Sequence, residues 1–504
     1  MNRIIIRSAA LLGLALFFLS YCTTETGAQL DGEELSKIYC IGCHAYPEPE
    51  DLPKHLWKST ILPRMGHFIG FYASANERAA LIEQNQGGQM VEDAGIYPKE
   101  PLLESTEWSA IQKFYLDAAP DSLMLPVFAA ADTLSQFDVK IPDYFMSPPA
   151  ATLVKIKEKG GFYLGDANQR STFVFDSEGE MIDRAQLREG PVWLEERQDA
   201  LYILVMGSFS PTDAPSGFLV RLPKDKAQPP QILIQGLQRP VHFEMEDVNG
   251  DGIEDFLICE FGKWTGGLSL WLSDGNTFAE RQIDQQSGAT KAYFEDINQD
   301  GQKDIVALFA QGQERITAYI AKEGSFERKD LLRFQPSWGS SFMRLTDWDE
   351  DGDLDILYTA GDNADYAPIL KPYHGIYRYE NDGLWNFSLL DFRPLYGAYN
   401  AMMADFDEDG QSELAAISFF PDFTADQSRG FVYYDDLGEE ERQTVLPSFE
   451  LGRWITMDAG DLDGDGDLDL ILGSLTMEVP DRPALVQAWV DKGIPFVVLE
   501  NITN

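Results

Sequence analysis

The feature that most constrains this chain is an acidic nine-residue segment that occurs five times. Its last copy runs from Asp461 to Asp469 with an Asp at every second position, and the apolar run Leu470-Ile471-Leu472 follows. Oxygen ligands at alternate positions, with a Gly that allows a sharp turn, can wrap a hard cation such as Ca²⁺. The segment recurs at an interval of roughly 50 residues, the size of a supersecondary unit, so it indicates a repeat architecture.

Each copy offers side-chain oxygens at its first, third, fifth and ninth positions. In chain order these residues are Asp247, Asn249, Asp251 and Asp255; Asp296, Asn298, Asp300 and Asp304; Asp347, Asp349, Asp351 and Asp355; Asp405, Asp407, Asp409 and Glu413; and Asp461, Asp463, Asp465 and Asp469. An EF-hand loop opens with the same spacing, but it needs flanking helices and a Glu at its twelfth position. Here short apolar runs such as Asp255-Phe256-Leu257-Ile258 follow, and they predict buried strands.

A hairpin signal comes after these strands. Asx-Gly turns such as Asp274-Gly275 and Asp382-Gly383 separate alternating strands. One strand before the loop, one after it and one hairpin make four strands per repeat, which is typical of a propeller blade. From about Pro149 to Asn504 the chain resembles the FG-GAP/VCBS family of calcium-binding β-propellers. The resemblance implies that the four oxygen-bearing positions of every copy bind Ca²⁺, up to five ions in all. Because oxygen-rich Ca²⁺ sites supply rigidity more readily than reactivity, we expect these ions to serve as scaffold rather than in catalysis or sensing.

Two further blades, around residues 161–180 and 192–220, lack the acidic loop, so we expect a mainly β, seven-bladed propeller over residues 149–504. Residues just before each loop are expected to line its central channel: Arg239, His242, Lys291, Trp338, Asn400, Arg453 and Trp454. These basic and aromatic groups can hold an anionic or sugar-like ligand, or they can balance the acidic loops. We favour the second interpretation.

The N-terminus is typical of an export signal. Arg3 and Arg7 precede an apolar stretch too short to span a bilayer comfortably. Leu19-Ser20-Tyr21-Cys22 resembles a bacterial lipoprotein box, which implies a signal peptide over residues 1–22 and a lipid on Cys22; cleavage after Ala28 is the alternative. We therefore predict a lipid-anchored protein of the bacterial cell envelope, in the periplasm or on the outer-membrane surface.

The segment Cys40-Ile41-Gly42-Cys43-His44 is a Cys-x-x-Cys-His motif, the attachment pattern of c-type haem. Two thiols would form thioethers with haem c and His44 would be the proximal iron ligand. A disulfide and a thioredoxin-like redox pair are the alternatives, but the motif ends an amphipathic helical run, residues 33–39, rather than opening a helix. Cys259, in the strand after the first acidic loop, is predicted to be a buried, unreactive thiol.

A second helix, residues 107–116, carries Trp108, Ile111, Phe114 and Tyr115 on one face, with Ser105 or Thr106 as its N-cap. With the haem motif, it makes residues 30–120 resemble a small all-α cytochrome c-like domain. Candidates for the distal ligand are Met65, His67, His55 and Met90. Met65 is favoured because its Pro/Gly context predicts a loop that can turn the side chain onto the haem.

The charge and the motifs of the sequence argue against several classes of function. The net charge of -44 argues against nucleic acid as a partner, because phosphates would be repelled. No nucleophile motif, Gly-rich phosphate loop or zinc pattern is present. Residues 121–148 are predicted to be a linker along the propeller and are a candidate source of a closing strand.

We therefore predict electron transfer, with an unidentified redox partner protein docked on the propeller. One alternative is an adhesion or ligand-binding propeller for a polysaccharide or protein, with the haem as tether or sensor. The other is a haem-linked dehydrogenase with its substrate in the channel, so whether the protein is an enzyme stays open.

Overall fold

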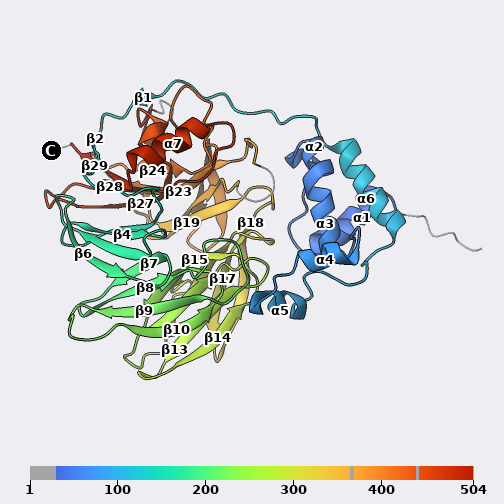
Figure 1. Ribbon diagram of the computed structural model, residues 1–504, viewed down its shortest axis with the longest axis horizontal. Coiled ribbons are helices and arrows are strands. Elements are labelled where there is room, and N and C mark those ends of the chain that lie inside the picture. The colour runs from blue at the N-terminus through green and yellow to red at the C-terminus, as the bar shows by residue number, and fades with distance from the viewer. Residues whose placement is uncertain (1–29, 364–367, 439–441, 503–504) are drawn as a thin grey trace, which may run out of the picture.

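The computed structural model describes residues 30–363, 368–438 and 442–502. Its strands form seven sheets arranged as a ring, so the predicted mainly β, seven-bladed propeller with N-terminal helices is confirmed. Figure 1 shows the helices, coloured blue to cyan, beside the propeller, with a long connector running from them to its far side. Among the described residues no helix has the length and apolarity needed to cross a membrane.

The helical region begins with α1 (Gly32–Tyr39) and ends with α6 (Ser105–Ala118). Between them lie η1 (Cys40–Gly42), η2 (Pro49–Asp51), α2 (Lys54–Leu56), the π-helical turn η3 (Trp57–Ile61), α3 (Leu62–Phe68), α4 (Ala75–Ala80) and α5 (Gln86–Asp93). Trp108, Ile111 and Tyr115 bury the predicted face of α6. The predicted N-cap is wrong, because Glu104 caps α6 through a reciprocal pair of hydrogen bonds with Glu107, and Ser105 already lies inside the helix.

Helices α1 and α6 cross at very short range. A Cβ on Gly32 would lie 2.2 Å from the carbonyl oxygen of Ala110, far inside van der Waals contact. Only glycine allows the two backbones to approach so closely. In the middle of α1, Leu35 packs with Trp57 and Tyr115 in the core of the helical region. The crossing therefore fixes the position of the cysteine motif that follows α1.

Each blade is a four-stranded antiparallel sheet whose innermost strand lines the ring. The first six are β3 (Ala151–Ile156), β4 (Phe162–Asp166), β5 (Ser171–Phe175), β6 (Met181–Gln186); β7 (Pro191–Glu196), β8 (Ala200–Val205), β9 (Gly217–Pro223), β10 (Gln231–Leu237); β11 (Pro240–Glu246), β12 (Asp255–Glu260), β13 (Gly267–Ser273), β14 (Phe278–Asp284); β15 (Ala289–Glu295), β16 (Asp304–Phe309), β17 (Arg315–Lys322), β18 (Ser325–Arg333); β19 (Ser340–Thr346), β20 (Asp355–Ala360), β21 (Gly375–Asn381), β22 (Phe387–Pro394); and β23 (Ala398–Ala404), β24 (Glu413–Ser418), β25 (Phe431–Asp436), β26 (Arg442–Val445). All second strands of the acidic-loop blades are buried throughout, as the apolar runs predict.

Blade seven is assembled from both ends of the chain. Strands β27 (Trp454–Gly460), β28 (Asp469–Ser474) and β29 (Phe496–Asn501) supply three of its strands, and helix α7 (Pro483–Lys492) lies between β28 and β29. The outer strand is β2 (Phe137–Lys140), which pairs antiparallel with β29, with Phe137 opposite Asn501. A two-residue strand, β1 (Asp132–Thr133), adds in parallel to β26. The predicted linker thus contributes the closing strand.

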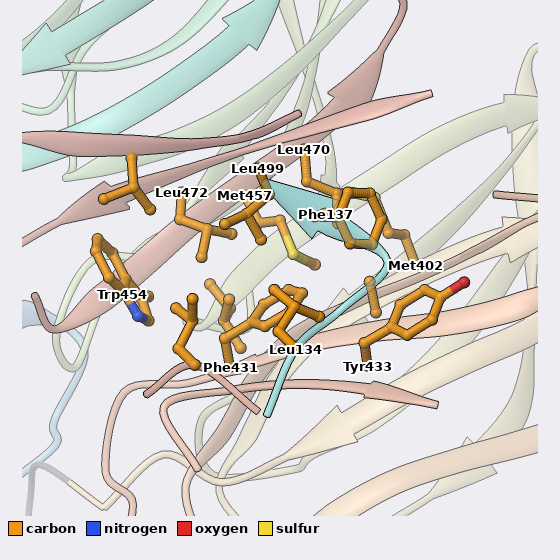
Figure 2. Close-up of a cluster of buried hydrophobic side chains, with 14 of the residues drawn as sticks. Leu134, Phe137, Met402, Phe431, Tyr433, Trp454, Met457, Leu470, Leu472 and Leu499 are labelled. Carbon is orange, nitrogen blue, oxygen red and sulfur yellow. The ribbon is translucent and has the colours of Figure 1, made fainter. Parts of the chain in front are cut away.

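Phe137 anchors this closure (Figure 2). It is buried between blades six and seven, in a hydrophobic cluster with Leu134, Met402, Tyr433 and Leu499. Its ring meets that of Tyr433 edge to face, at 5.3 Å between centroids. Hydrophobic burial therefore reinforces the backbone pairing that closes the ring.

The helical region packs on one face of the propeller. Trp264, between β12 and β13, contacts the ring of Phe68 at 5.1 Å, and the neighbouring Lys263 lies 3.6 Å from the Glu83 carboxylate. Tyr373 donates a hydrogen bond to the Asp51 carbonyl. Connections between second and third strands lie at the opposite end of a blade from those between first and second strands. The acidic loops are therefore on the face away from the helices.

Candidate functional site

All five acidic loops lie between the first and second strands of a blade and share one backbone conformation. The fourth and sixth positions are left-handed in every copy: Gly250 and Gly252, Gln299 and Gly301, Glu350 and Gly352, Glu408 and Gly410, and Gly464 and Gly466. Two left-handed residues so close together turn the chain back on itself and direct the alternating side chains toward one point. The Gly at position six is therefore required by conformation.

The ninth residue of each loop is the first residue of the buried second strand. Asp255 is fully buried; its Oδ2 accepts from the Val248 N–H at 3.3 Å and its Oδ1 accepts from the Ser273 N–H at 2.8 Å. Asp469 makes the corresponding contacts with Leu462 and Asn501. This carboxylate thus ties the loop to the third strand of its blade. Burial raises the pKa of both carboxyl groups.

The donor set suits a hard cation. Carboxylate oxygens lie within 4.8 Å of one another in the last three loops, from Asp347, Asp349 and Asp351; from Asp405, Asp407, Asp409 and Glu413; and from Asp461, Asp463 and Asp469. Buried oxygens of Asp347, Asp355 and Asp405 have no hydrogen-bond donor. Burial, with the neighbouring carboxylates, raises the pKa of Glu413 to about 7. Oxygen ligands crowded in this way are what Ca²⁺ prefers.

In the loops of blades three and four, backbone N–H groups of the same loop donate hydrogen bonds to the first carboxylate. Asp247 accepts hydrogen bonds from the backbone N–H groups of Gly250, Asp251 and Gly252. In blade four, Asp296 similarly accepts from Asp300 and Gly301. The third position of both loops is Asn, so each lacks the carboxylate that the other three loops carry at this position.

The cysteine motif occupies a single helical turn after α1. Cys40 and Cys43 are free thiols, half-buried and exposed respectively. Burial raises the pKa of Cys40 to about 11, whereas a thioredoxin-like pair depends on a thiol of lowered pKa. The Nδ1 of His44 lies 2.8 Å from the Ala45 carbonyl oxygen, and burial lowers the pKa of its ring. A neutral imidazole oriented through Nδ1 leaves Nε2 for a metal.

The surroundings of the motif also suit a flat apolar group. Ile38 and Ile41, on either side of Cys40, have 55% and 57% of their surface exposed. Exposed isoleucines next to a half-buried thiol and a half-buried histidine provide apolar contact area. The residues present therefore fit a covalently attached haem.

The four candidate distal ligands lie in different settings. Met65 lies in helix α3, so the predicted loop is wrong; Pro63 occupies the first turn of that helix, where its missing N–H is tolerated. Met65 is half-buried and packs against the core of the helical region. His67 lies 3.2 Å from the Glu77 carboxylate, His55 is exposed, and Met90 is half-buried in α5.

The residues predicted to line the central channel also lie in different settings. His242 and Lys291 lie on the inner strands β11 and β15, with Nε2 and Nζ 2.6 Å apart, and the Lys291 ammonium sits 4.0 Å from the centroid of Trp193. Asn400 is on β23, with a buried Oδ1 that has no donor. Trp454, in contrast, belongs to the hydrophobic core between blades six and seven. The alternation along β27 therefore points Trp454 away from the channel.

The other three residues lie at the ends of the inner strands. Arg453 is buried. Its guanidinium donates a hydrogen bond to the Phe419 carbonyl and stacks on the Phe419 ring, with Cζ 4.0 Å from the ring centroid. Trp338 stacks with Tyr373 and Tyr377 beneath the helical region. Arg239 donates to the Gly262 carbonyl. These contacts support the loops, so most of the basic and aromatic groups are structural.

Sequence reasoning missed five charged residues on the inner strands: Lys155, Glu195, Glu244, Arg344 and Asp458. Lys155 pairs with Glu195 at 2.6 Å, and Asp458 accepts from the Ile156 N–H at 2.8 Å. Burial raises the pKa of Glu244 and lowers that of Lys291. A signal existed, because Glu244, Arg344 and Asp458 each stand three residues before the first Asp of an acidic loop. Cys259 is buried in β12, as predicted.

Comparisons with known proteins agree with this architecture. Residues 247–307 and 296–358 match the family model of the FG-GAP-like repeat, and this region contains the first three acidic loops. The fold and the repeats define the class: the chain is a seven-bladed β-propeller with FG-GAP repeats, a scaffold for binding or docking. No curated protein matches the sequence.

Solved structures resemble the chain at low identity and with TM-scores below 0.5. Virginiamycin B lyase from Staphylococcus aureus is 9% identical, with 72% of this chain and 100% of that chain covered and a TM-score of 0.47. Sqt1 from Saccharomyces cerevisiae is 8% identical, with 72% and 98% covered and a TM-score of 0.42. Neither likeness carries an argument about activity. The export signal and Cys22 lie outside the described residues.

Proposed function

We propose that this protein is an exported c-type haem protein that transfers electrons, with the propeller as a docking scaffold for its redox partner. The observation that carries the proposal is the cysteine motif. It places two free thiols on one helical turn, followed by a neutral histidine whose Nδ1 faces a backbone carbonyl. The raised pKa of Cys40 favours a structural thiol over a reactive redox pair.

Each residue of the helical region would have a defined task. Cys40 and Cys43 would hold the haem through thioethers, and His44 would ligate the iron through Nε2. Met65 is the favoured distal ligand, because His67 is engaged by Glu77 and His55 points to solvent. A bound haem supplies one-electron redox chemistry, while these residues set its orientation and exclude water.

The five acidic loops would bind Ca²⁺ on the face away from the helices, and the ions would brace the blades. Unpartnered buried carboxylate oxygens in the last three loops support this assignment. Lipidation of Cys22 would hold the protein at a bacterial membrane, in the periplasm or on the outer-membrane surface. Such an anchor leaves the propeller free to dock a partner.

The deciding experiment is expression of the full chain with a cytochrome c maturation system, followed by denaturing electrophoresis with haem staining and visible spectra of the oxidised and reduced protein. We expect haem to remain attached after denaturation, to disappear in Cys40→Ala/Cys43→Ala, and to change its low-spin spectrum in Met65→Ala. Cys259→Ala is the matched cysteine control and should keep the haem. Absence of covalent haem, while a control cytochrome matures, would leave a calcium-braced binding propeller without electron transfer.

A further inference from the structure

The seventh position of the acidic loops separates them into two kinds. Its occupants are Ile253, Gln302, Asp353, Gln411 and Asp467 in chain order. In an EF-hand loop this position contributes only its backbone carbonyl. The loops of blades five and seven instead carry a carboxylate at every odd position, which gives each loop five carboxylates in alternation.

Asp467 is the more informative of the two extra carboxylates. It is 3% exposed, and among the described residues neither of its oxygens accepts a hydrogen bond. The negative charges of Asp465, Asp469 and Asp463 in the same loop repel that of Asp467. In blade five, Asp353 repeats the pattern with a buried Oδ1 that has no donor. Asp349 and Asp351 are its neighbours.

A buried carboxylate without a donor, among other carboxylates, is unfavourable unless a cation lies within reach. Blades three and four show the contrast, since no carboxylate oxygen of their loops is both buried and without a donor in the described structure. We propose that Asp353 and Asp467 are additional cation ligands, which makes the loops of blades five and seven the tightest Ca²⁺ sites. This inference rests on the calcium part of the proposed function and is independent of the haem.

The location of Asp467 gives the site a particular task. Asp469 Oδ1 accepts from the N–H of Asn501, the last residue of β29, and the Asn501 side chain donates to the Leu468 carbonyl. Strand β29 in turn pairs with the closing strand β2. A cation held by this loop therefore braces the blade in which the two ends of the chain meet.

The test is a Ca²⁺ titration of the calcium-stripped full chain, read by competition with Tb³⁺ luminescence. Asp467→Asn and Asp353→Asn keep the side-chain shape and remove one charge. We expect each to weaken one of the two tightest sites at least about tenfold. Asp121→Asn, whose side chain is 95% exposed outside the loops, is the matched control and should titrate as wild type. Circular dichroism in Ca²⁺ checks that each variant is folded.

A gain of function keeps the inference falsifiable if either variant folds poorly. Gln302→Asp places a carboxylate at the seventh position of the blade-four loop and should tighten a weak site. Curves for Asp467→Asn and Asp353→Asn that superimpose on wild type, or an unchanged Gln302→Asp, would overturn the inference while the calcium proposal stands. A wild type that binds no Ca²⁺ would overturn both and leave the haem proposal untouched.

Discussion

Replacing Phe137 by Ala tests how much the closure of the propeller contributes to its stability. Phe137 is 3% exposed and lies between Tyr433 and Phe406, with ring centroids 5.3 Å and 5.9 Å away. Strand β2 has only four residues, and its pairing with β29 offers few backbone hydrogen bonds. The side chain should therefore account for a large part of what holds β2 in place.

The magnitude follows from the burial. Replacing a fully buried Phe by Ala costs about 3–5 kcal/mol, since the transfer free energy is lost and a cavity remains. We expect Phe137→Ala to lower the free energy of unfolding by about 4 kcal/mol. For a propeller of this size, with an unfolding entropy of about 2 cal/mol/K per residue, that loss lowers the Tm by roughly 5 °C.

Calorimetry of the Ca²⁺-loaded protein measures the Tm, and limited proteolysis detects release of the segment that carries β2. Phe145→Ala is the matched control, because Phe145 belongs to the same segment and is 65% exposed. Its effect should stay within about 0.5 kcal/mol. If Phe137→Ala melts with its control and resists protease equally, β2 does not close the ring and the reasoning is refuted.

Three further outcomes are expected. Gly32→Ala should destabilise the helical region by about 3 kcal/mol, because its Cβ would overlap the α6 backbone. Gly42→Ala is the control and should not destabilise it, because open space surrounds Gly42. Hydrogen exchange of α1 and α6 distinguishes the two variants. Burial and neighbouring carboxylates hold the pKa of Glu413 and Asp467 at about 7, above their unfolded values, so the folded state binds these protons more tightly. In chelator, the Tm should therefore rise as the pH falls from about 7 to about 5. A flat profile of Tm against pH would contradict this. Glu350→Gly should stabilise by roughly 0.5–1 kcal/mol in urea melts, since Glu350 has a φ of 59°; a lower midpoint would count against backbone strain.

The propeller could be predicted because its repeat is local and redundant. Asp255 and its four counterparts mark where each buried strand begins, and a hairpin turn such as Asp274-Gly275 marks the next reversal. Five copies in register leave little freedom in blade number. The inward-facing charges, such as Glu244 and Asp458, were predictable from the same offset.

Elements that depend on tertiary packing were harder to predict. Pro63 and Gly66 predict a loop around Met65, yet the residues form α3 because Leu62 is buried in the helical core. Trp454 stands close to an acidic loop in sequence, but the pleat of β27 points it into the core between blades. The contact of Trp264 with Phe68 joins segments with no pattern in common, so no sequence signal announces it.

The closing blade also sets the order in which this protein can be completed. Gln136 and Asn501, which hydrogen-bond beside β2, are separated by 365 positions in the chain. At about 5–20 residues per second, synthesis leaves β2 without its partner for roughly 20–70 seconds. During that time β2 has no strand to pair with, and unpaired strand edges invite pairing with other chains. The last blade therefore leaves this fold exposed to aggregation until the end of the chain is in place.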